Sequence, residues 1–399
     1  MEWIECTLGE ICDIGGGEVK TGPFGSQLHQ SDYEDEGIPV VMPKDIIDGR
    51  VLEDSIARVN DGHIERLSQH KLSEGDIVYG RRGDIGRQAL VRIENAGWLC
   101  GTGCLRVTLG KNSAVSSRFL HLYLKQPDVI TWIANQAIGA TMPNLNTSIL
   151  RSVPVKYPSN YSYQDQLADK IFAYGNLIEN NTRRIAVLED MAQSLYREWF
   201  VKFRFPGHED SQFKDSSLGK IPEGWEVKLF SELVDYKTGK LNSNAAVETG
   251  DYPFFTCSQE TFRTNTWSFD CECVLLGGNN ANAIYPIKYF EGKFDAYQRT
   301  YVITEKNRDQ ITPAYLYFSL LLKLTHLKNI STGSATRFLT KGILDNLEFI
   351  VPPPSLMSDF NSMGLSALKL KNSIVKKNEA IRKQRDMLLP KIISGRIEV

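Results

Sequence analysis

The sequence predicts a mixed α/β protein with two globular α/β domains in tandem, separated by two long helices that pair as an antiparallel coiled coil. Two observations favour this fold class: an apolar seam with heptad spacing in two stretches, and strings of the first half that recur in the second. At 399 residues the chain is also too long for one ordinary core. We place the first globular domain at 1–157, its helix at 158–203, the linker and second globular domain at 204–352, and the second helix at 353–399.

The strongest periodic signal is an apolar seam with a spacing of 3.5 residues. In the first helix it comprises Leu167, Ile171, Tyr174, Ile178, Asn181, Ile185, Leu188, Ala192, Leu195 and Trp199. At an offset of 196 the second helix gives Met363, Ala367, Leu370, Ile374, Lys377, Ile381, Gln384 and Leu388. In an antiparallel pair the polar seam residues Asn181 and Lys377 would lie near one another. Two alternatives remain: each seam contacts a different subunit, or the helices are ordinary amphipathic helices of separate domains.

The globular parts repeat as well. Segment 139–150 matches 333–344 in its glycine, its central leucine and its terminal Ile-Leu, and each is followed by a short apolar stretch and a proline. Trp3 and its following Thr-Leu-Gly-Glu resemble Trp225 and its following Phe-Ser-Glu-Leu at a larger offset. The first copy therefore carries extra residues before about position 76, and the chain is a tandem duplication. Short β-rich runs between glycine-rich turns predict mixed domains.

Composition limits the function classes. No apolar run approaches the about 20 residues of a membrane span, and the start lacks the basic and apolar regions of an export signal. Seven cysteines do not suggest a disulfide framework, so we expect a cytoplasmic protein with free thiols. The net charge of −2 and pI of about 6.4 count mildly against nucleic-acid binding. However, 369–396 holds nine Lys and Arg and two acidic residues, which indicates either a basic surface or a solvated helix face.

No enzyme motif is found. The Asn/Asp/Ser-Pro-Pro-aromatic loop of an amino-methyltransferase is absent, because the triple proline at 352–354 lies between a valine and a serine. The glycines at 15–17 and 22 lack the spacing of a nucleotide-binding loop. The acid-x-Lys pair of Glu291 and Lys293, which a nuclease could use, has no well-placed partner acid. We therefore expect a chain without catalytic residues.

Metal chemistry is also poorly supported. The cysteine pairs at 100 and 104 and at 271 and 273 do not have the usual zinc spacing, and the duplicated positions are not cysteine. The six histidines form no motif. We expect neither a metal nor a cofactor in this chain.

The turns of both copies carry side chains suited to DNA. Arginine can bind guanine bidentately or contact phosphate, and asparagine pairs best with adenine, so the two domains would read different bases. For each residue the alternative is a surface turn with a solvated side chain. The DNA-binding candidates are Lys20, Thr21, Ser26, Gln27, Arg81, Arg82 and Arg87 in the first copy, and Lys237, Lys240, Asn279, Asn280, Asn282, Gln298, Arg299 and Arg337 in the second.

Several strings together resemble a known family over essentially the full length. They are Trp3 with Thr-Leu-Gly-Glu at 7–10, Thr-Gly-Pro-Phe-Gly-Ser-Gln-Leu at 21–28, Gly-Asp-Ile-Val at 75–78, Leu-Glu-Asp-Met-Ala-Gln-Ser-Leu-Tyr-Arg-Glu-Trp-Phe-Val-Lys-Phe at 188–203, Ser-Leu-Gly-Lys-Ile-Pro-Glu-Gly-Trp at 217–225, and 385–397. The chain resembles the specificity (S) subunit of type I restriction–modification systems. One departure lies at the helix starts, where the family often has Pro-Pro-Leu and an acid-Gln pair.

This resemblance implies two target-recognition domains, each reading half of an interrupted double-stranded DNA site, with helices that set the spacer. It also implies two docked methyltransferase (modification) subunits that use S-adenosylmethionine, and two restriction (motor) subunits that use ATP and Mg²⁺ where the system restricts. The alternatives are a coiled-coil scaffold that binds only proteins and a fused single-chain DNA methyltransferase.

Overall fold

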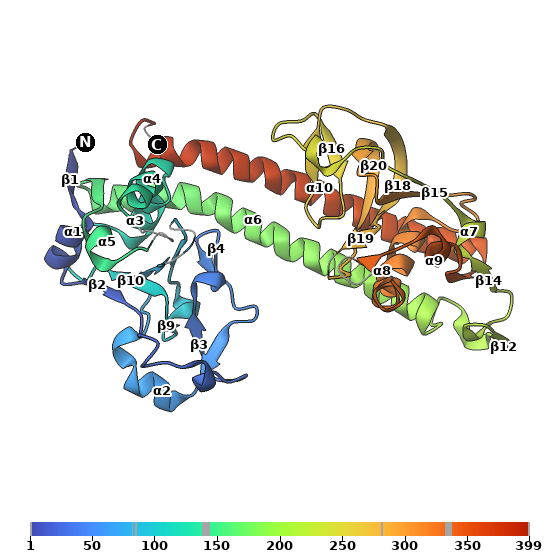
Figure 1. The fold of residues 1–399 in the computed structure, drawn as a ribbon, viewed down its shortest axis with the longest axis horizontal. Coiled ribbons are helices and arrows are strands. Elements are labelled where there is room, and N and C mark those ends of the chain that lie inside the picture. The colour runs from blue at the N-terminus through green and yellow to red at the C-terminus, as the bar shows by residue number, and fades with distance from the viewer. Residues whose placement is uncertain are drawn as a thin grey trace. The chain divides into compact units, whose positions relative to one another are not determined.

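The chain folds into two compact units (Figure 1). The computed structural model describes residues 2–81, 83, 86–137, 144–280, 282–331 and 337–397. Unit 1 comprises Met1–Glu179 and Glu379–Val399, and unit 2 comprises Asn180–Asn378. The division passes through both long helices, α6 (Tyr161–Tyr196), which continues as a π-helical turn over Arg197–Val201, and α10 (Pro354–Ile393). Because this division cuts through the helices and does not separate them from the globular domains, it does not test the domain boundaries predicted from the sequence, and these stay a prediction.

Unit 1 contains small sheets and short helices. A four-stranded antiparallel sheet has the order β2 (Glu18–Thr21), β10 (Cys104–Thr108), β7 (Ile77–Gly80), β8 (Gln88–Leu90). A three-stranded sheet has the order β6 (Ala57–Val59), β3 (Ile38–Val41), β9 (Leu99–Cys100). The remaining strands are β1 (Trp3–Thr7) with β11 (Pro154–Pro158) and β4 (Ile46–Ile47) with β5 (Arg50–Val51). The short helices are α1 (Leu8–Gly15), α2 (Asp61–Arg66), α3 (Ser117–Leu124), α4 (Pro127–Gln136) and α5 (Thr147–Arg151).

Unit 2 is built around a larger sheet. Its six strands have the order β15 (Val234–Thr238), β21 (Thr300–Glu305), β18 (Phe269–Gly277), β20 (Ile287–Ala296), β16 (Tyr252–Phe255), β17 (Phe262–Thr264). The other strand pairs are β12 (Phe213–Ser216) with β13 (Gly219–Pro222), β14 (Glu226–Leu229) with β23 (Glu348–Val351), and β19 (Asn279–Asn280) with β22 (Arg337–Phe338). The helices are α7 (Phe230–Leu233), α8 (Pro313–Ile330) and α9 (Lys341–Asp345).

The two units repeat one topology. The order β2-β10-β7-β8 of unit 1 corresponds to β15-β21-β18-β20 of unit 2. In unit 1 β3 pairs in parallel with β9, and in unit 2 β16 pairs in parallel with the end of β20, so β20 takes the place of both β8 and β9. The long helix α8 corresponds to α3 and α4, which are separated just before Pro127, because a proline disfavours the helical backbone of the residue before it. The duplication in the sequence is thus a duplication of the fold.

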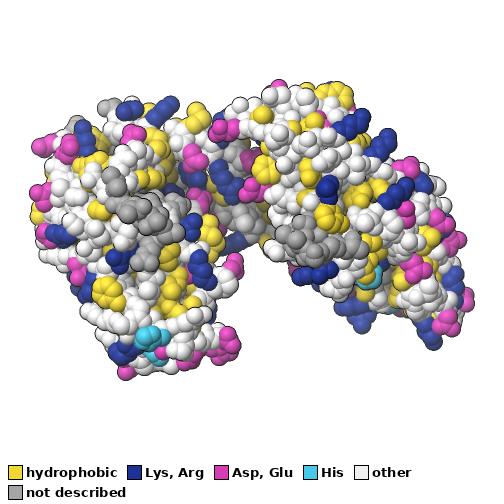
Figure 2. All heavy atoms as spheres, in the orientation of Figure 1, with side chains coloured by type: hydrophobic (Ala, Val, Ile, Leu, Met, Phe, Trp, Pro, Cys, Tyr) yellow, Lys and Arg dark blue, Asp and Glu magenta, His cyan; other side chains and the backbone are white. Residues whose placement is uncertain are grey.

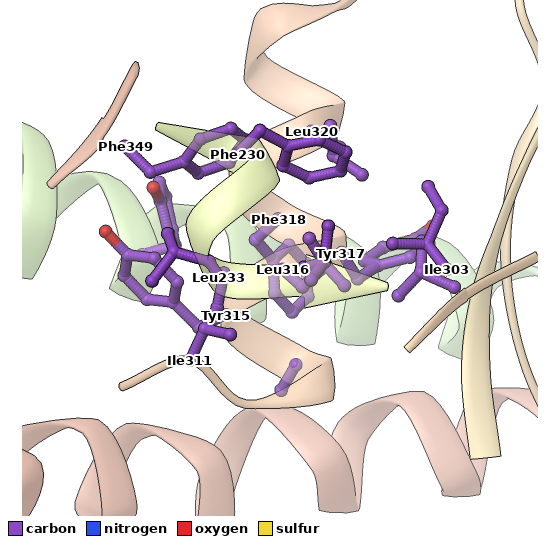
Figure 3. Packing of buried hydrophobic residues seen from close by; sticks show 14 of the residues in the cluster. Phe230, Leu233, Ile303, Ile311, Tyr315, Leu316, Tyr317, Phe318, Leu320 and Phe349 are labelled. Atoms are coloured by element: carbon purple, nitrogen blue, oxygen red, sulfur yellow. The ribbon is translucent and has the colours of Figure 1, made fainter. Parts of the chain in front are cut away.

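Each unit has its own hydrophobic core. In unit 2 the first turns of α8 are buried, and Figure 3 shows Tyr315, Leu316 and Phe318 of this helix near Leu233 of α7. The rings of Phe230 and Phe349 stack with their centroids 5.1 Å apart and close this core against β23. In unit 1 a separate core gathers side chains of the four-stranded sheet, α1, α3 and α5.

The long helices take part in both cores and are antiparallel. In unit 1, Leu167 and Ile171 of α6 belong to the same cluster as Ile392 of α10. In unit 2, Trp199 belongs to the same cluster as Phe360. The beginning of each helix therefore packs with the end of the other, which is the pairing that the heptad seams predict.

The register of this pair differs from the predicted one. Asn181 Nδ2 donates a hydrogen bond to Asn378 Oδ1 over 2.8 Å, and both side chains are buried, so the polar partner of Asn181 is Asn378. The predicted partner Lys377 is exposed. Met363 and Leu370, also predicted for the seam, are each 44% exposed. The prediction was wrong here because it counted apolar residues, whereas α10 exposes some of them and buries small or polar ones such as Gly364.

The other predicted seam residues lie inside the pair or at its margin. Ile178, Ile374 and Ile381 are buried. Partly buried positions are Tyr174, Ile185, Leu188 and Leu195 of α6 and Ala367 and Leu388 of α10, whereas Gln384 is exposed.

The Asn181–Asn378 hydrogen bond leads to a prediction about stability. Asn181→Leu alone should lower the free energy of unfolding by about 1–3 kcal/mol, because the buried amide of Asn378 loses this partner. The double variant Asn181→Leu/Asn378→Leu should recover most of that loss, since two apolar side chains then face each other. Urea unfolding of the two single variants and the double variant measures the coupling. Losses that simply add would contradict this account of the pair.

Candidate nucleic-acid interface

Four loops of unit 1 meet at one edge of its four-stranded sheet. Strands β2 and β7 end at this edge and β8 and β10 begin there, because Thr21 pairs with Leu105, Gly80 with Cys104 and Tyr79 with Gln88. The loops at this edge are 22–29, 81–87 without positions 82, 84 and 85, and 101–103, and the segment at 144–146 is hydrogen-bonded to them. We call these loops the first loop cluster.

Backbone hydrogen bonds hold the first loop cluster together. Arg81 N donates to Gly103 O over 2.8 Å, and Leu145 N donates to Arg81 O over 2.9 Å. The two loops at 22 and 101 approach so closely that a Cβ on Gly22 would lie 2.1 Å from the carbonyl oxygen of Gly101. This contact requires glycine. The cluster is therefore a defined surface whose loops support one another.

Among the residues predicted for the first copy, those that the structure describes lie in or beside this cluster, in different roles. Ser26 is exposed at the loop tip, and Lys20 and Thr21 end β2. Gln27 Oε1 accepts a hydrogen bond from Phe24 N over 3.0 Å, so this side chain closes its own turn. Two arginines also bind neighbouring loops: Arg81 Nε donates to Asn144 Oδ1 over 3.2 Å and Arg87 Nη1 donates to Pro43 O over 3.1 Å. Arg82 lies outside the described residues.

Unit 2 forms an equivalent surface at the same edge of its sheet. Strands β15 and β18 end there and β20 and β21 begin there. Gly278 N donates to Arg299 O over 2.7 Å, and Gln298 N donates to Leu241 O over 3.0 Å, so the loops again bind each other. We call 239–247, 278–286 without position 281, 297–299 and 337–340 the second loop cluster.

All the predicted residues of the second copy lie at this surface or at the strand ends that carry it. Lys237, Lys240, Asn282, Gln298, Arg299 and Arg337 are exposed. Asn280 Oδ1 accepts a hydrogen bond from Asn282 N over 2.8 Å and shapes the turn. The guanidinium of Arg299 lies 4.9 Å from the centre of the Phe338 ring, a cation–π contact that orients it. Asn279 Oδ1 is buried and accepts no hydrogen bond from the described residues.

Sequence reasoning missed Phe24. This side chain is 59% exposed at the tip of the first loop cluster, between Pro23 and Gly25. An aromatic ring at such a position can make an apolar contact with the methyl group of thymine, as the hydrogen-bonding side chains beside it contact other base edges. The signal in the sequence was a phenylalanine within a glycine-rich turn. It was missed because only polar and charged side chains were considered as DNA contacts.

Charged side chains of both signs are spread over the surface of the molecule. Figure 2 shows Lys and Arg side chains interspersed with Asp and Glu over the visible face, in agreement with the net charge of −2.

Burial raises the pKa of the Cys100 thiol to about 12 and that of Cys12 to about 11, so both are protonated at neutral pH. Within the described ranges, no three His, Cys, Asp or Glu side chains come together in a way that could hold a metal ion. None of the helices described is long and apolar enough to cross a membrane.

The comparison with protein families gives the assignment. The family described as "Type I restriction modification DNA specificity domain" matches residues 1–190 and again 222–356, which is most of the chain and one match for each loop cluster. The chain belongs to this family of specificity subunits. The family assignment confirms the resemblance seen in the sequence.

Two curated relatives match this specificity subunit over very different lengths. A curated relative, the EcoDI specificity subunit of Escherichia coli, is 39% identical over 139 residues, which is 35% of this chain and 30% of that protein. The MjaIX specificity subunit of Methanocaldococcus jannaschii is 22% identical over 426 aligned residues and covers all of this chain and 94% of its own. A solved S subunit of a type I system from M. genitalium has a TM-score of 0.64 at 15% identity, with 98% of this chain and 96% of that chain covered. This likeness shows the shared fold of tandem domains and long helices.

Proposed function

We propose that this specificity subunit reads an interrupted double-stranded DNA target, one half-site with each loop cluster. The observation that carries the proposal is the repeated sheet edge, which presents different side chains in the two units. The first cluster has Arg81 and Arg87 where the second has 279–282, rich in asparagine. Because arginine pairs best with guanine and asparagine with adenine, the two half-sites should differ in sequence.

The long helices would set the spacer between the half-sites and dock partner subunits. In this proposal the exposed apolar side chains of both helices are the candidates for contacts with those subunits. They are Leu177, Val187 and Met191 of α6 and Met363, Leu370 and Met387 of α10. The partners of this proposal are two methyltransferase (modification) subunits and, where the system restricts, two restriction (motor) subunits.

The chemistry would take place in those partners, and this chain would act in the cytoplasm without catalytic residues of its own. The methyltransferase subunits would bind S-adenosylmethionine and flip the target adenine out of the duplex for N6 methylation. ATP and Mg²⁺ would bind to the restriction subunits. In support, the sequence lacks the Pro-Pro-aromatic loop that an amino-methyltransferase needs.

Domain-wise reading is tested with one arginine from each cluster. Arg81→Ala should relax selectivity at the first half-site only, and Arg299→Ala at the second only, each by about tenfold, because a bidentate contact contributes about 1–3 kcal/mol of discrimination. The measurement is the methylation rate of duplexes in which one half-site at a time is changed. Arg308→Ala is a matched control, since Arg308 lies beyond the opposite end of β21 and binds Glu272 over 2.8 Å. Equal loss at both half-sites from either variant, with the fold intact, would contradict domain-wise reading.

A further inference from the structure

One connection between strands is much longer in unit 1 than its counterpart in unit 2. The chain between β3 and β6 spans 42–56, whereas the chain between the corresponding strands β16 and β17 spans only 256–261. The longer segment forms the hairpin β4–β5, which lies beside α6 in Figure 1. This insertion accounts for part of the extra length of the first copy.

The hairpin binds α6 through charged side chains. Arg50 Nη1 forms an ion pair with Glu179 Oε2, and Arg92 Nη1 lies 3.7 Å from the same oxygen. Arg50 and Glu179 are both largely buried, at 24% and 28% side-chain exposure. The guanidinium of Arg50 passes directly over Gly175, where an added Cβ would lie 3.4 Å from Nη2.

The tip of the same hairpin binds α10. Arg385 Nη1 lies 3.2 Å from Asp48 Oδ2, and Lys125 Nζ lies 3.6 Å from Asp48 Oδ1. Burial by itself raises the pKa of Asp48, but Lys125 and Arg385 outweigh it, so the net pKa lies below its usual value. Asp48 is therefore a carboxylate held between two cations, one from its own domain and one from α10. The Asp48 side chain is 51% exposed, whereas Lys125 and Arg385 are 24% and 14% exposed, so each pair is only partly shielded from water.

The backbone at the tip of the hairpin forms a tight two-residue turn. Asp48 has a φ of +49° and Gly49 a φ of +82°, both in the left-handed region. A Cβ on Gly49 would lie 2.8 Å from Lys125 Nζ. Positive φ at both residues of a two-residue hairpin loop is typical of the type I′ turn, for which Asp-Gly is a favoured sequence. The turn therefore places the Asp48 carboxylate beside Lys125 and Arg385 without backbone strain.

The hairpin is a second attachment of the first domain to the helices. The first attachment is the apolar core, which includes Leu167 and Ile171 of α6. Glu179 lies further along the same helix, about 18 Å from Leu167 at 1.5 Å per residue. The apolar core also includes Leu389 and Ile393 of α10. The hairpin adds contacts farther along α6 and so lengthens the span over which the domain is held against the helices.

In unit 2 the contacts with α10 are made by strand β20 and not by a hairpin. Glu291 and Tyr289 of β20 bind α10, through Lys369 Nζ over 2.8 Å and Asn372 Nδ2 over 3.0 Å. The shorter segment 256–261 is held by Lys288 of β20, whose Nζ donates to Glu260 O over 2.6 Å. The charged hairpin is thus a feature of the first copy.

We propose that residues 46–51 are a brace that fixes the angle of the first recognition domain on the long helices and so restricts the target to one spacer length. The inference rests on the proposed function. One added base pair shifts a half-site by about 3.4 Å and turns it by about 35° around the DNA axis. A recognition domain that could tilt would follow this shift, and a braced domain does not. Asp48 and Arg50 are positioning residues in this account and contact no DNA.

The test uses the complex of this subunit with its methyltransferase subunits and three sets of duplexes. All carry the same half-sites, with the preferred spacer or one base pair fewer or more. Asp48→Asn/Arg50→Met removes the charges on the hairpin, and asparagine tolerates the left-handed backbone at 48. We expect the preference for the correct spacer to fall about tenfold, while methylation at that spacer changes by less than about threefold.

Two further variants separate the brace from a general loss of packing. Arg58→Met is the matched control, because Arg58 pairs with Glu53 over 2.5 Å within the same domain, and it should leave the spacer preference unchanged. Arg50→Lys keeps the charge beside Glu179 and should retain most of the preference. If the double variant does not fold, Arg50→Met alone gives the same comparison.

The outcomes are distinct. A parallel fall at all three spacers, or the same change from Arg58→Met, would overturn the brace. If the wild-type complex showed no preference for any interrupted target, the proposed function itself would fail. A reduced preference for the correct spacer with unchanged half-sites would support both.

Discussion

Phe360→Ala is expected to lower the free energy of unfolding of unit 2 by about 3–5 kcal/mol. Phe360 is fully buried on α10, and its ring lies 5.0 Å from the centre of Phe200 and 5.8 Å from that of Tyr196. Truncation would leave a cavity where α10 meets the end of α6. Urea unfolding followed by tryptophan fluorescence measures the loss, since Trp199 lies beside the same ring at 6.1 Å.

Phe24→Ala is the matched control, with the same change at a side chain that is 59% exposed. Its effect on the free energy of unfolding should stay within about 0.5 kcal/mol, because an exposed ring loses little packing. Similar losses for the two variants would show that Phe360 does not join the helices as described.

Shortening both long helices by matched turns is expected to change the spacer of the DNA target and leave both half-sites as they are. The blocks to delete are 182–185 of α6 and 374–377 of α10, which follow Asn181 and precede its partner Asn378. Each deletion removes about 6 Å of helix at 1.5 Å per residue, between one and two base pairs of DNA. After the deletion in α6, Leu188 follows Asn181 by three residues and Ala192 follows Leu188 by four. The seam spacing is therefore retained across the joint.

Methylation at the original spacer should fall about a hundredfold or more, because one half-site is no longer engaged. Sequencing of methylated adenines in DNA modified by the variant complex gives the new target. Replacing the same blocks by alanine keeps the helix length and should keep the spacer. New half-sites in the shortened variant, or an unchanged spacer, would contradict the assignment of the helices as a ruler.

The long helices could be predicted from the sequence because heptad spacing is a local signal that runs through the whole element. Their register could not be predicted in the same way. Met363 and Leu370 are apolar but exposed, and the residue that meets Asn181 is Asn378, one position beyond the predicted Lys377. Which face of a helix is buried depends on its partner. The pattern of apolar residues in one helix therefore does not decide between two neighbouring positions, such as 377 and 378, as the partner of Asn181.

The loop clusters were predictable as turns but not as surfaces. Glycines and polar side chains mark the turns, yet the role of each side chain depends on distant residues. Arg87 binds Pro43, and Asn280 shapes its own turn. The contact of the unit 1 hairpin with α6 was out of reach for the same reason, since Arg50 and Glu179 are separated by 129 positions and only the fold brings them together.

The central claim is that the two loop clusters read two half-sites at a fixed separation. A map of the methylated adenines in DNA modified by the complex of this chain with its methyltransferase subunits tests it most directly. We expect one motif made of two short, different blocks separated by a constant number of unspecified base pairs. A continuous motif, or methylation at either block without the other, would contradict it.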